Sequence, residues 1–167
     1  TLAVESGNGD GWYTNGSPVA ISADASARHY EFDRWTGDTN RVANVFSAIT
    51  TLTMPFTNVV LTATYKPIFY PLTVVNGSGS GEYLYRSTVE ITAPQLTGKQ
   101  FYRWTGDVEA VASPASSATT LTMPDVPTVV VATYSVPLTV NDGSGSGWHP
   151  EGSAVTVTAD PDPLYME

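Results

Sequence analysis

The chain contains no cysteine, which excludes disulfide bonds and thiolate metal sites. Charged residues make up only 14% of the 167 residues, and seven of them are basic. With a net charge of −9, the chain lacks the clusters of lysine and arginine that a nucleic-acid backbone requires. It also lacks any apolar run near the roughly 20 residues needed to span a bilayer. We therefore expect neither nucleic-acid binding nor membrane insertion.

What the chain does contain is a repeat. The letters WTGD begin at Trp35 and again at Trp104, and TTLTMP begins at Thr50 and again at Thr119, both shifted by 69 residues. A glycine-rich opening occurs three times, as LAVESGNGDGW, LTVVNGSGSGE and LTVNDGSGSGW. Self-similarity at a fixed period is the signature of tandem modules. We expect two complete modules and one partial module, with boundaries at 1–66, 67–136 (including a linker) and 137–167.

Apolar and polar residues alternate within each copy, which predicts half-buried strands. Val19 and Ile21 show this pattern in the first copy, and Val155, Val157 and Ala159 show it in the partial third copy. The glycine-rich loops and the prolines after TTLTM are typical of tight turns. The fold class expected is therefore mainly β, with about five short strands per complete module, joined as antiparallel hairpins.

One stretch has apolar residues at helical spacing instead. Between WTGD and TTLTMP, Val42, Val45, Phe46 and Ile49 could lie on one side of a helix. The second copy has Pro114 in place of Val45, and a proline inside a helix costs about 3 kcal/mol. We expect a loop with one helical turn at most.

The order of these motifs resembles the divergent relatives of the internalin B-repeat. The matching features are an LTV strand, GSGSG, a VxIxA strand, F-x-x-WTGD, TTLTMP and a closing V-x-ATY, and they cover nearly the whole chain. The resemblance implies a small β-grasp-like fold, tandem arrays in larger bacterial proteins, and export to the cell surface or beyond. It implies no catalytic activity and no cofactor.

The carboxylates and histidines do not form a recurring catalytic set. Glycoside hydrolysis needs two facing carboxyl groups, and only the aspartate of WTGD recurs, since Glu31 is replaced by Gln100. His29 and His149 occupy non-equivalent positions, so no histidine triad or zinc site repeats. We do not expect an enzyme.

The RWTGD motif itself has a structural and a functional interpretation. In the first, Trp35 and Trp104 fill the cores, and Asp38 and Asp107 bind backbone N–H groups at a turn. A bulge must then lie between the tryptophan and the phenylalanine three residues earlier, because such a pair cannot share one face of a regular strand. In the second, the aspartate is an acid or a metal ligand. With no partner carboxylate recurring, the structural interpretation is favoured.

Two further groups are candidate binding residues. Asp10 and Asp142 lie beside flexible glycines and are weak calcium candidates, because calcium needs six or more oxygen ligands and few are visible. Aromatic residues follow each glycine-rich loop and could stack on sugars or contact a partner, namely Trp12, Tyr13, Tyr83, Tyr85 and Trp148. Small modules use most large aromatics for packing, which favours that role over binding.

These observations lead to two functional hypotheses. The first is a structural repeat of an exported bacterial surface, stalk or filament protein, whose partners are other copies of itself. The incomplete third copy would leave strand edges uncovered, so either the sequence is cut within this copy or another chain completes the sheet. The second alternative predicts head-to-tail assembly by strand augmentation. The second is a binding or adhesive module for polysaccharide, attached to a secreted enzyme or adhesin. Both place the chain outside the cell or on its surface.

Overall fold

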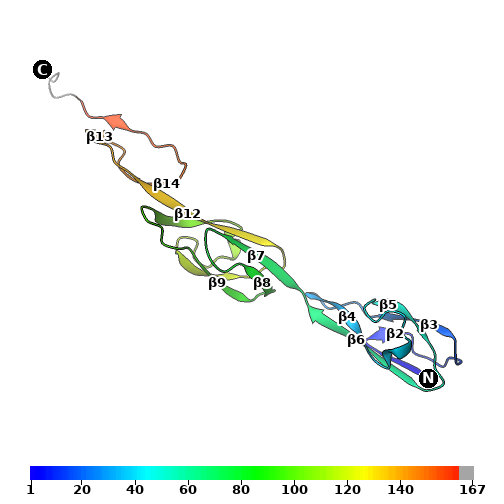
Figure 1. Cartoon of the computed structure of the whole chain (residues 1–167). Coiled ribbons are helices and arrows are strands. Elements are labelled where there is room, and N and C mark those ends of the chain that lie inside the picture. The colour runs from blue at the N-terminus through cyan, green and yellow to red at the C-terminus, as the bar shows by residue number, and fades with distance from the viewer. Residues whose placement is uncertain (162–167) are drawn as a thin grey trace. The chain divides into compact units, whose positions relative to one another are not determined.

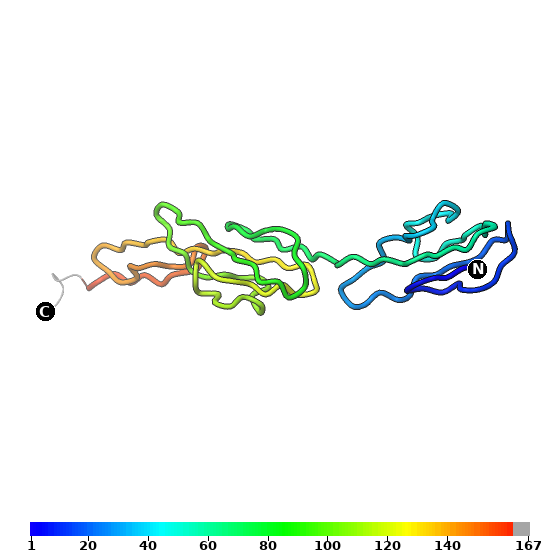
Figure 2. Tube along the Cα trace, turned by 90° about the horizontal axis from the view of Figure 1, so that it is seen from below, coloured from blue at the N-terminus to red at the C-terminus, as the bar shows by residue number. Residues whose placement is uncertain are grey.

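The computed structural model describes residues 1–161 and contains no α-helix in that range. The chain divides into two compact units, Thr1–Ile68 and Phe69–Glu167, which are coloured blue to cyan and green to red in Figure 1 and traced in Figure 2. The expectation of a mainly β fold is confirmed. The partial third copy belongs to the second unit, and the residues 162–167 of its expected range lie outside the described part.

The first unit consists of two small sheets that pack against each other. One sheet has the order β1-β6-β4 and the other β2-β3-β5. A 3-10 turn, η1, follows β4. The elements are β1 (Leu2–Glu5), β2 (Gly7–Asn8), β3 (Pro18–Ala23), β4 (Tyr30–Gly37), η1 (Thr39–Arg41), β5 (Ile49–Thr53) and β6 (Val59–Pro67).

The second unit repeats this arrangement and adds strands from the third copy. Its larger sheet has the order β10-β12-β7-β8, with β14 also paired to β12, while β9 pairs with β11. The elements of the second copy are β7 (Phe69–Val75), β8 (Gly81–Leu84), β9 (Thr88–Thr92), β10 (Gln100–Gly106), η2 (Val108–Ala110), β11 (Ala118–Thr122) and β12 (Thr128–Leu138). The third copy supplies β13 (Gly143–Ser144), β14 (Gly147–Pro150) and β15 (Thr158–Ala159).

The first and last strands of each complete copy are parallel neighbours. Leu2 pairs with Val59 in the first copy, and Leu72 pairs with Thr128 in the second. The expectation that all strands form antiparallel hairpins is therefore wrong. Two parallel strands need a long crossover, and the other strands of each copy supply it before the chain returns beside its first strand. Periodicity in the sequence shows where strands lie but carries no sign of their direction.

The stretch with helical spacing forms only a short turn. In each copy a three-residue 3-10 helix follows WTGD, and the residues after it continue as a loop. Val42 and Val111 return to extended backbone and each bridges to the leucine of TTLTMP. The expected limit of one helical turn is met in both copies.

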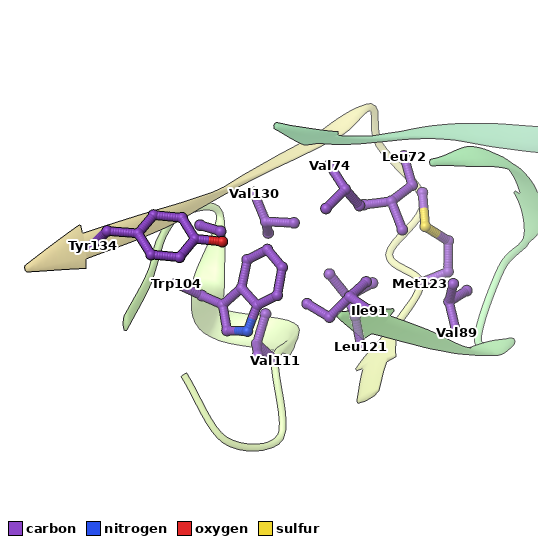
Figure 3. Close-up of a cluster of buried hydrophobic side chains, with 11 residues drawn as sticks. Leu72, Val74, Val89, Ile91, Trp104, Val111, Leu121, Met123, Val130 and Tyr134 are labelled. Atoms are coloured by element: carbon purple, nitrogen blue, oxygen red, sulfur yellow. The ribbon is translucent and has the colours of Figure 1, made fainter. Parts of the chain in front are cut away.

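Each unit has its own hydrophobic core, built from equivalent positions. Trp35 is 1% exposed and Trp104 is 0% exposed. Figure 3 shows the Trp104 indole among the side chains of Val130, Val111 and Ile91, which belong to both sheets and to the loop after η2. The tryptophan therefore joins the two layers of its unit.

The third copy departs from the strand pattern expected for it. Val157 is 55% exposed, whereas the equivalent Ile21 and Ile91 are 1% and 0% exposed. The expected strand through Val155 and Val157 is absent, and only Thr158–Ala159 pairs, with Gly143–Ser144. In the complete copies this strand pairs with β5 or β11, and Val155 and Val157 pair with no such strand among residues 1–161. An alternating pattern without that partner does not form the longer strand.

Replacing Trp104 with alanine should lower the free energy of unfolding of the second unit by about 3–5 kcal/mol, because a fully buried aromatic leaves a cavity. Urea denaturation followed by circular dichroism measures this change. The control is Trp12→Ala, since Trp12 is 89% exposed and its loss should cost less than about 0.5 kcal/mol. Equal effects of the two replacements would contradict the assignment of Trp104 to the core.

Candidate functional site

The RWTGD strand contains a bulge in both copies. The register of β4 on β6 shifts between Phe32 and Arg34, and that of β10 on β12 shifts between Phe101 and Arg103. The extra residue turns phenylalanine and tryptophan toward the same side of the sheet. Their ring centroids are 5.8 Å apart in the first copy and 5.7 Å apart in the second. The motif thus brings two aromatic rings into one core.

The tryptophan also holds the loop that follows it. Trp35 Nε1 donates a hydrogen bond of 3.0 Å to the carbonyl oxygen of Ser47, and Trp104 Nε1 donates one of 2.9 Å to that of Ser116. A buried indole N–H needs such an acceptor. The same side chain therefore fills the core and anchors the segment between WTGD and TTLTMP.

The aspartate of WTGD closes the end of the strand. Asp107 N donates to the Val129 carbonyl at 2.9 Å, and its Oδ2 accepts from Val129 N at 2.8 Å. Asp38 makes the same pair of bonds with Val60, both at 2.9 Å. One residue thereby satisfies both the donor and the acceptor of its neighbour on the last strand. This pair of bonds is a structural clasp between the motif and the last strand.

The glycine before this aspartate is required by its conformation. Gly37 has a φ of +94° and Gly106 a φ of +90°, a region that other residues rarely adopt. A Cβ atom at Gly106 would also strike the carbonyl oxygen of Val129. The glycine and the aspartate therefore act together to end the strand.

Asp10 has a structural contact that serine makes in the other copies. Its Oδ1 accepts a hydrogen bond of 2.8 Å from Val4 N. Ser80 Oγ accepts from Val74 N at 2.8 Å, and Ser146 Oγ accepts from Val140 N at 2.8 Å. Because an uncharged serine fulfils the same task, the contact needs no carboxylate chemistry.

The second calcium candidate, Asp142, also occupies a turn. Asp142 lies in a turn with a φ of +53°, and its carbonyl accepts from Asp160 N at 2.9 Å. Within residues 1–161, no three histidine, aspartate or glutamate side chains gather in a way that could hold a metal ion. The geometry of Asp10 and Asp142 is that of turn residues.

The aromatic candidates divide into two groups. Tyr13 and Tyr83 donate from their hydroxyl groups to the carbonyls of Gly9 and Gly79, at 3.0 and 2.9 Å. His149 Nε2 lies 2.9 Å from the Gly145 carbonyl, in the equivalent place. These three side chains brace their own glycine-rich loops. Tyr85 is half-buried, and the Arg86 guanidinium lies 5.1 Å from its ring centroid.

Trp12 and Trp148 belong to the second group. Trp12 is 89% exposed and Trp148 is 51% exposed, while the second copy has Glu82 at this position. Because the second copy folds with a glutamate there, the fold does not require an aromatic side chain at this point.

The third copy docks onto the second through a continuous strand. Strand β12 runs on into the third copy, and β14 pairs with its end from Ser135↔Pro150 to Leu138↔Gly147 (Figure 1). Glu151 N donates to the Tyr134 carbonyl at 2.9 Å. Lys99 Nζ lies 2.9 and 2.7 Å from the two carboxylate oxygens of Glu151. Backbone pairing and an ion pair together hold this joint.

Tyr134 lies at the base of the joint and is 5% exposed. Its hydroxyl donates to the Pro94 carbonyl at 2.8 Å. Burial raises the pKa of Tyr134, and nearby Lys99 partly opposes this. In the first copy, burial and the charge of Asp24 raise the pKa of Tyr65, whose hydroxyl donates to the Asp24 carbonyl at 2.7 Å. Both tyrosines therefore serve as neutral hydrogen-bond donors.

A surface hollow lies where the hairpin of the third copy meets the second copy. We call it the joint hollow. It is lined by Ala93, Pro94, Gln95, Leu96, Lys99, Gln100, Phe101, Ala115, Ser116, Ser117 and Trp148. Of the aromatic candidates, it includes only Trp148. The glutamines were not identifiable from sequence, because they do not recur between copies and belong to no motif.

A family model described as a divergent InlB B-repeat domain matches residues 1–69 and 70–137. These two tandem regions cover most of the chain, so the chain belongs to this family, which is associated with bacterial surface proteins. The suspected resemblance and the tandem repeats are thereby confirmed. No curated protein and no solved structure matches the chain. Among the described residues, no helix has the length and apolar character needed to cross a membrane.

The clasp made by WTGD can be tested at Asp107. Asp107→Ala should lower the free energy of unfolding by about 1–2 kcal/mol, because Val129 N loses a charged acceptor. Asp107→Asn keeps an acceptor oxygen and should cost clearly less. Denaturant titration of the two variants beside the parent chain measures both effects. A neutral Asp107→Ala, or an Asp107→Asn as harmful as alanine, would count against the clasp.

Proposed function

We propose that the chain is a non-catalytic, load-bearing repeat segment of an exported bacterial surface, stalk or filament protein. The observation that carries this proposal is the parallel pairing of the first and last strands in both complete copies. Membership of a repeat family associated with bacterial surface proteins supports it.

The direction of pulling explains why this pairing matters. Tension along the chain pulls β1 from its start and β6 from its end. Because these strands are parallel neighbours, the force acts along them in opposite directions and loads all four residue pairs from Leu2↔Val59 to Glu5↔Thr62 together. Each hydrogen bond contributes a net of only about 0.5–1.5 kcal/mol, so bonds that break one after another resist little force. Here the bonds of the ladder must break together.

Side chains reinforce the same pair of strands. The Thr1 hydroxyl Oγ1 donates to Asn58 Oδ1 at 3.0 Å, before the first pair. Thr62 Oγ1 donates to Glu5 Oε2 at 2.9 Å, at the last pair. The parallel ladder of the first copy is thus bridged by side chains at both of its ends.

Single-molecule pulling on the first unit tests this proposal. Since the chain has no cysteine, one introduced cysteine gives a unique attachment point. A handle at the N-terminus and a second at Lys66→Cys load the β1–β6 ladder lengthwise, whereas a second handle at Thr57→Cys peels the same ladder from one end. Unfolding should require a higher force in the first geometry.

The two variants share the β1–β6 ladder, and Lys66→Cys removes in addition only the exposed ion pair with Glu31 (3.2 Å), so the comparison isolates the direction of force on the ladder. Equal unfolding forces in both geometries would overturn the load-bearing role. Denaturant titration of both unloaded variants checks that the cysteines leave stability unchanged.

We further propose that the third copy takes part in head-to-tail assembly by strand augmentation. Val157 is 55% exposed, and its equivalents in the complete copies are covered by β5 or β11. A strand of the TTLTMP type from another chain would cover the same position. The partner in this proposal is a second copy of the same kind of repeat.

This assembly should appear as a mass that rises with protein concentration in light scattering. Val157→Asp should reduce the rise, because a charge on the uncovered face opposes strand addition. Val126→Asp is the matched control, since Val126 is a similarly exposed valine (53%) in the turn between β11 and β12. A monomeric chain at all concentrations, or equal effects of the two variants, would overturn the assembly.

A second candidate function, polysaccharide binding, is favoured by the joint hollow. The hollow combines an exposed tryptophan with amide and hydroxyl side chains.

A further inference from the structure

The joint hollow is built by two copies and exists only where they meet. Trp148 comes from the hairpin of the third copy, while Gln95, Gln100 and Ser116 come from the second. Strand β14 is fixed on β12 by backbone pairing, and this pairing positions Trp148 opposite Pro137 in the ladder. The tryptophan is therefore held at the border of the hollow by strand pairing.

Comparison between copies shows that the fold does not require these side chains. Gln100 occupies the position that Glu31 has in the first copy, and Lys99 occupies the position of Tyr30. Tyr30 is the first residue of β4 and Lys99 directly precedes β10, and each donates its backbone N–H to the carbonyl of the residue three positions earlier. The structural positions are thus shared, but the amide-rich surface belongs to the second copy alone.

The charge of the hollow is balanced. Lys99 is the charged residue in its lining, and both carboxylate oxygens of Glu151 lie within 2.9 Å of Lys99 Nζ. The hollow thus offers no unpaired charge to an anionic or cationic ligand, although the chain carries a net charge of −9. This favours an uncharged ligand.

The uncharged chemistry of the lining suits a sugar. The side-chain amides of Gln95 and Gln100 are exposed and can donate and accept hydrogen bonds, as sugar hydroxyl groups do. The 51% exposed Trp148 offers an aromatic surface for the C–H face of a sugar ring.

We propose that the joint hollow binds a neutral oligosaccharide, with Trp148 as the stacking surface and Gln95 and Gln100 as hydrogen-bonding partners. This function goes beyond load bearing. It depends on the docked joint between the second and third copies, and it does not depend on the strength of the β1–β6 ladder or on assembly between chains.

Titration of the ¹⁵N-labelled full chain with cellohexaose, chitohexaose and mannohexaose tests the proposal. At least one sugar should shift the indole N–H signal of Trp148 and the amide signals of Gln95 and Gln100. The signal of Trp12 should stay in place, because Trp12 is exposed but belongs to the first unit and is not among the residues that line the hollow.

Three variants then locate the binding. Trp148→Ala should weaken it at least tenfold, and Gln95→Ala combined with Gln100→Ala should do the same without touching the docked hairpin. Trp12→Ala is the matched control and should bind as the parent chain does. The backbone signal of Glu151 reports in each variant whether the hairpin remains docked.

Absence of binding by all three sugars would overturn the proposal while leaving the pulling experiment unaffected. Binding that survives in both the Trp148 variant and the double glutamine variant would overturn it as well. Loss of binding in Trp12→Ala would place the sugar elsewhere and equally count against the joint hollow.

Discussion

The buried tryptophan of WTGD is the interaction on which each complete copy depends. Trp104 contacts residues of both sheets, and its indole N–H holds the Ser116 carbonyl of the following loop. A module of this size buries little apolar surface, so one large side chain supplies a large share of its core. The bulge before Trp104 also admits Phe101 to that core. Without the tryptophan, the two layers and the loop would lose their common contact.

The path of the chain follows from this two-layer closure. The first strand lies in one sheet, the chain then builds the second sheet, and the last strand returns beside the first in parallel. The aspartate of WTGD is bonded to the start of that last strand, at Val60 or Val129. Core packing and the proposed resistance to tension are therefore linked, because the strands that would carry the load also enclose the tryptophan.

The repeated copies separate what the fold needs from what it leaves free. Asp10, Ser80 and Ser146 differ in charge but make the same bond to a backbone N–H group, so this position needs only an oxygen acceptor. Two residues further on, the three copies have Trp12, Glu82 and Trp148, and the fold accepts all three. Surface chemistry such as that of the joint hollow is carried by positions of this second kind.

The sequence by itself determined the repeats, the strand positions and the place of the tryptophan. These follow from local patterns: the recurrence of WTGD, the alternation around Ile21, and the proline at Pro114 that limits the helical turn. Only the tertiary structure decided that β1 and β6 are parallel, that Val157 is exposed, and that Trp148 lines the same hollow as Gln95 and Gln100. Periodicity reports which face of a strand is buried, while strand direction and partners depend on contacts between residues far apart in the chain.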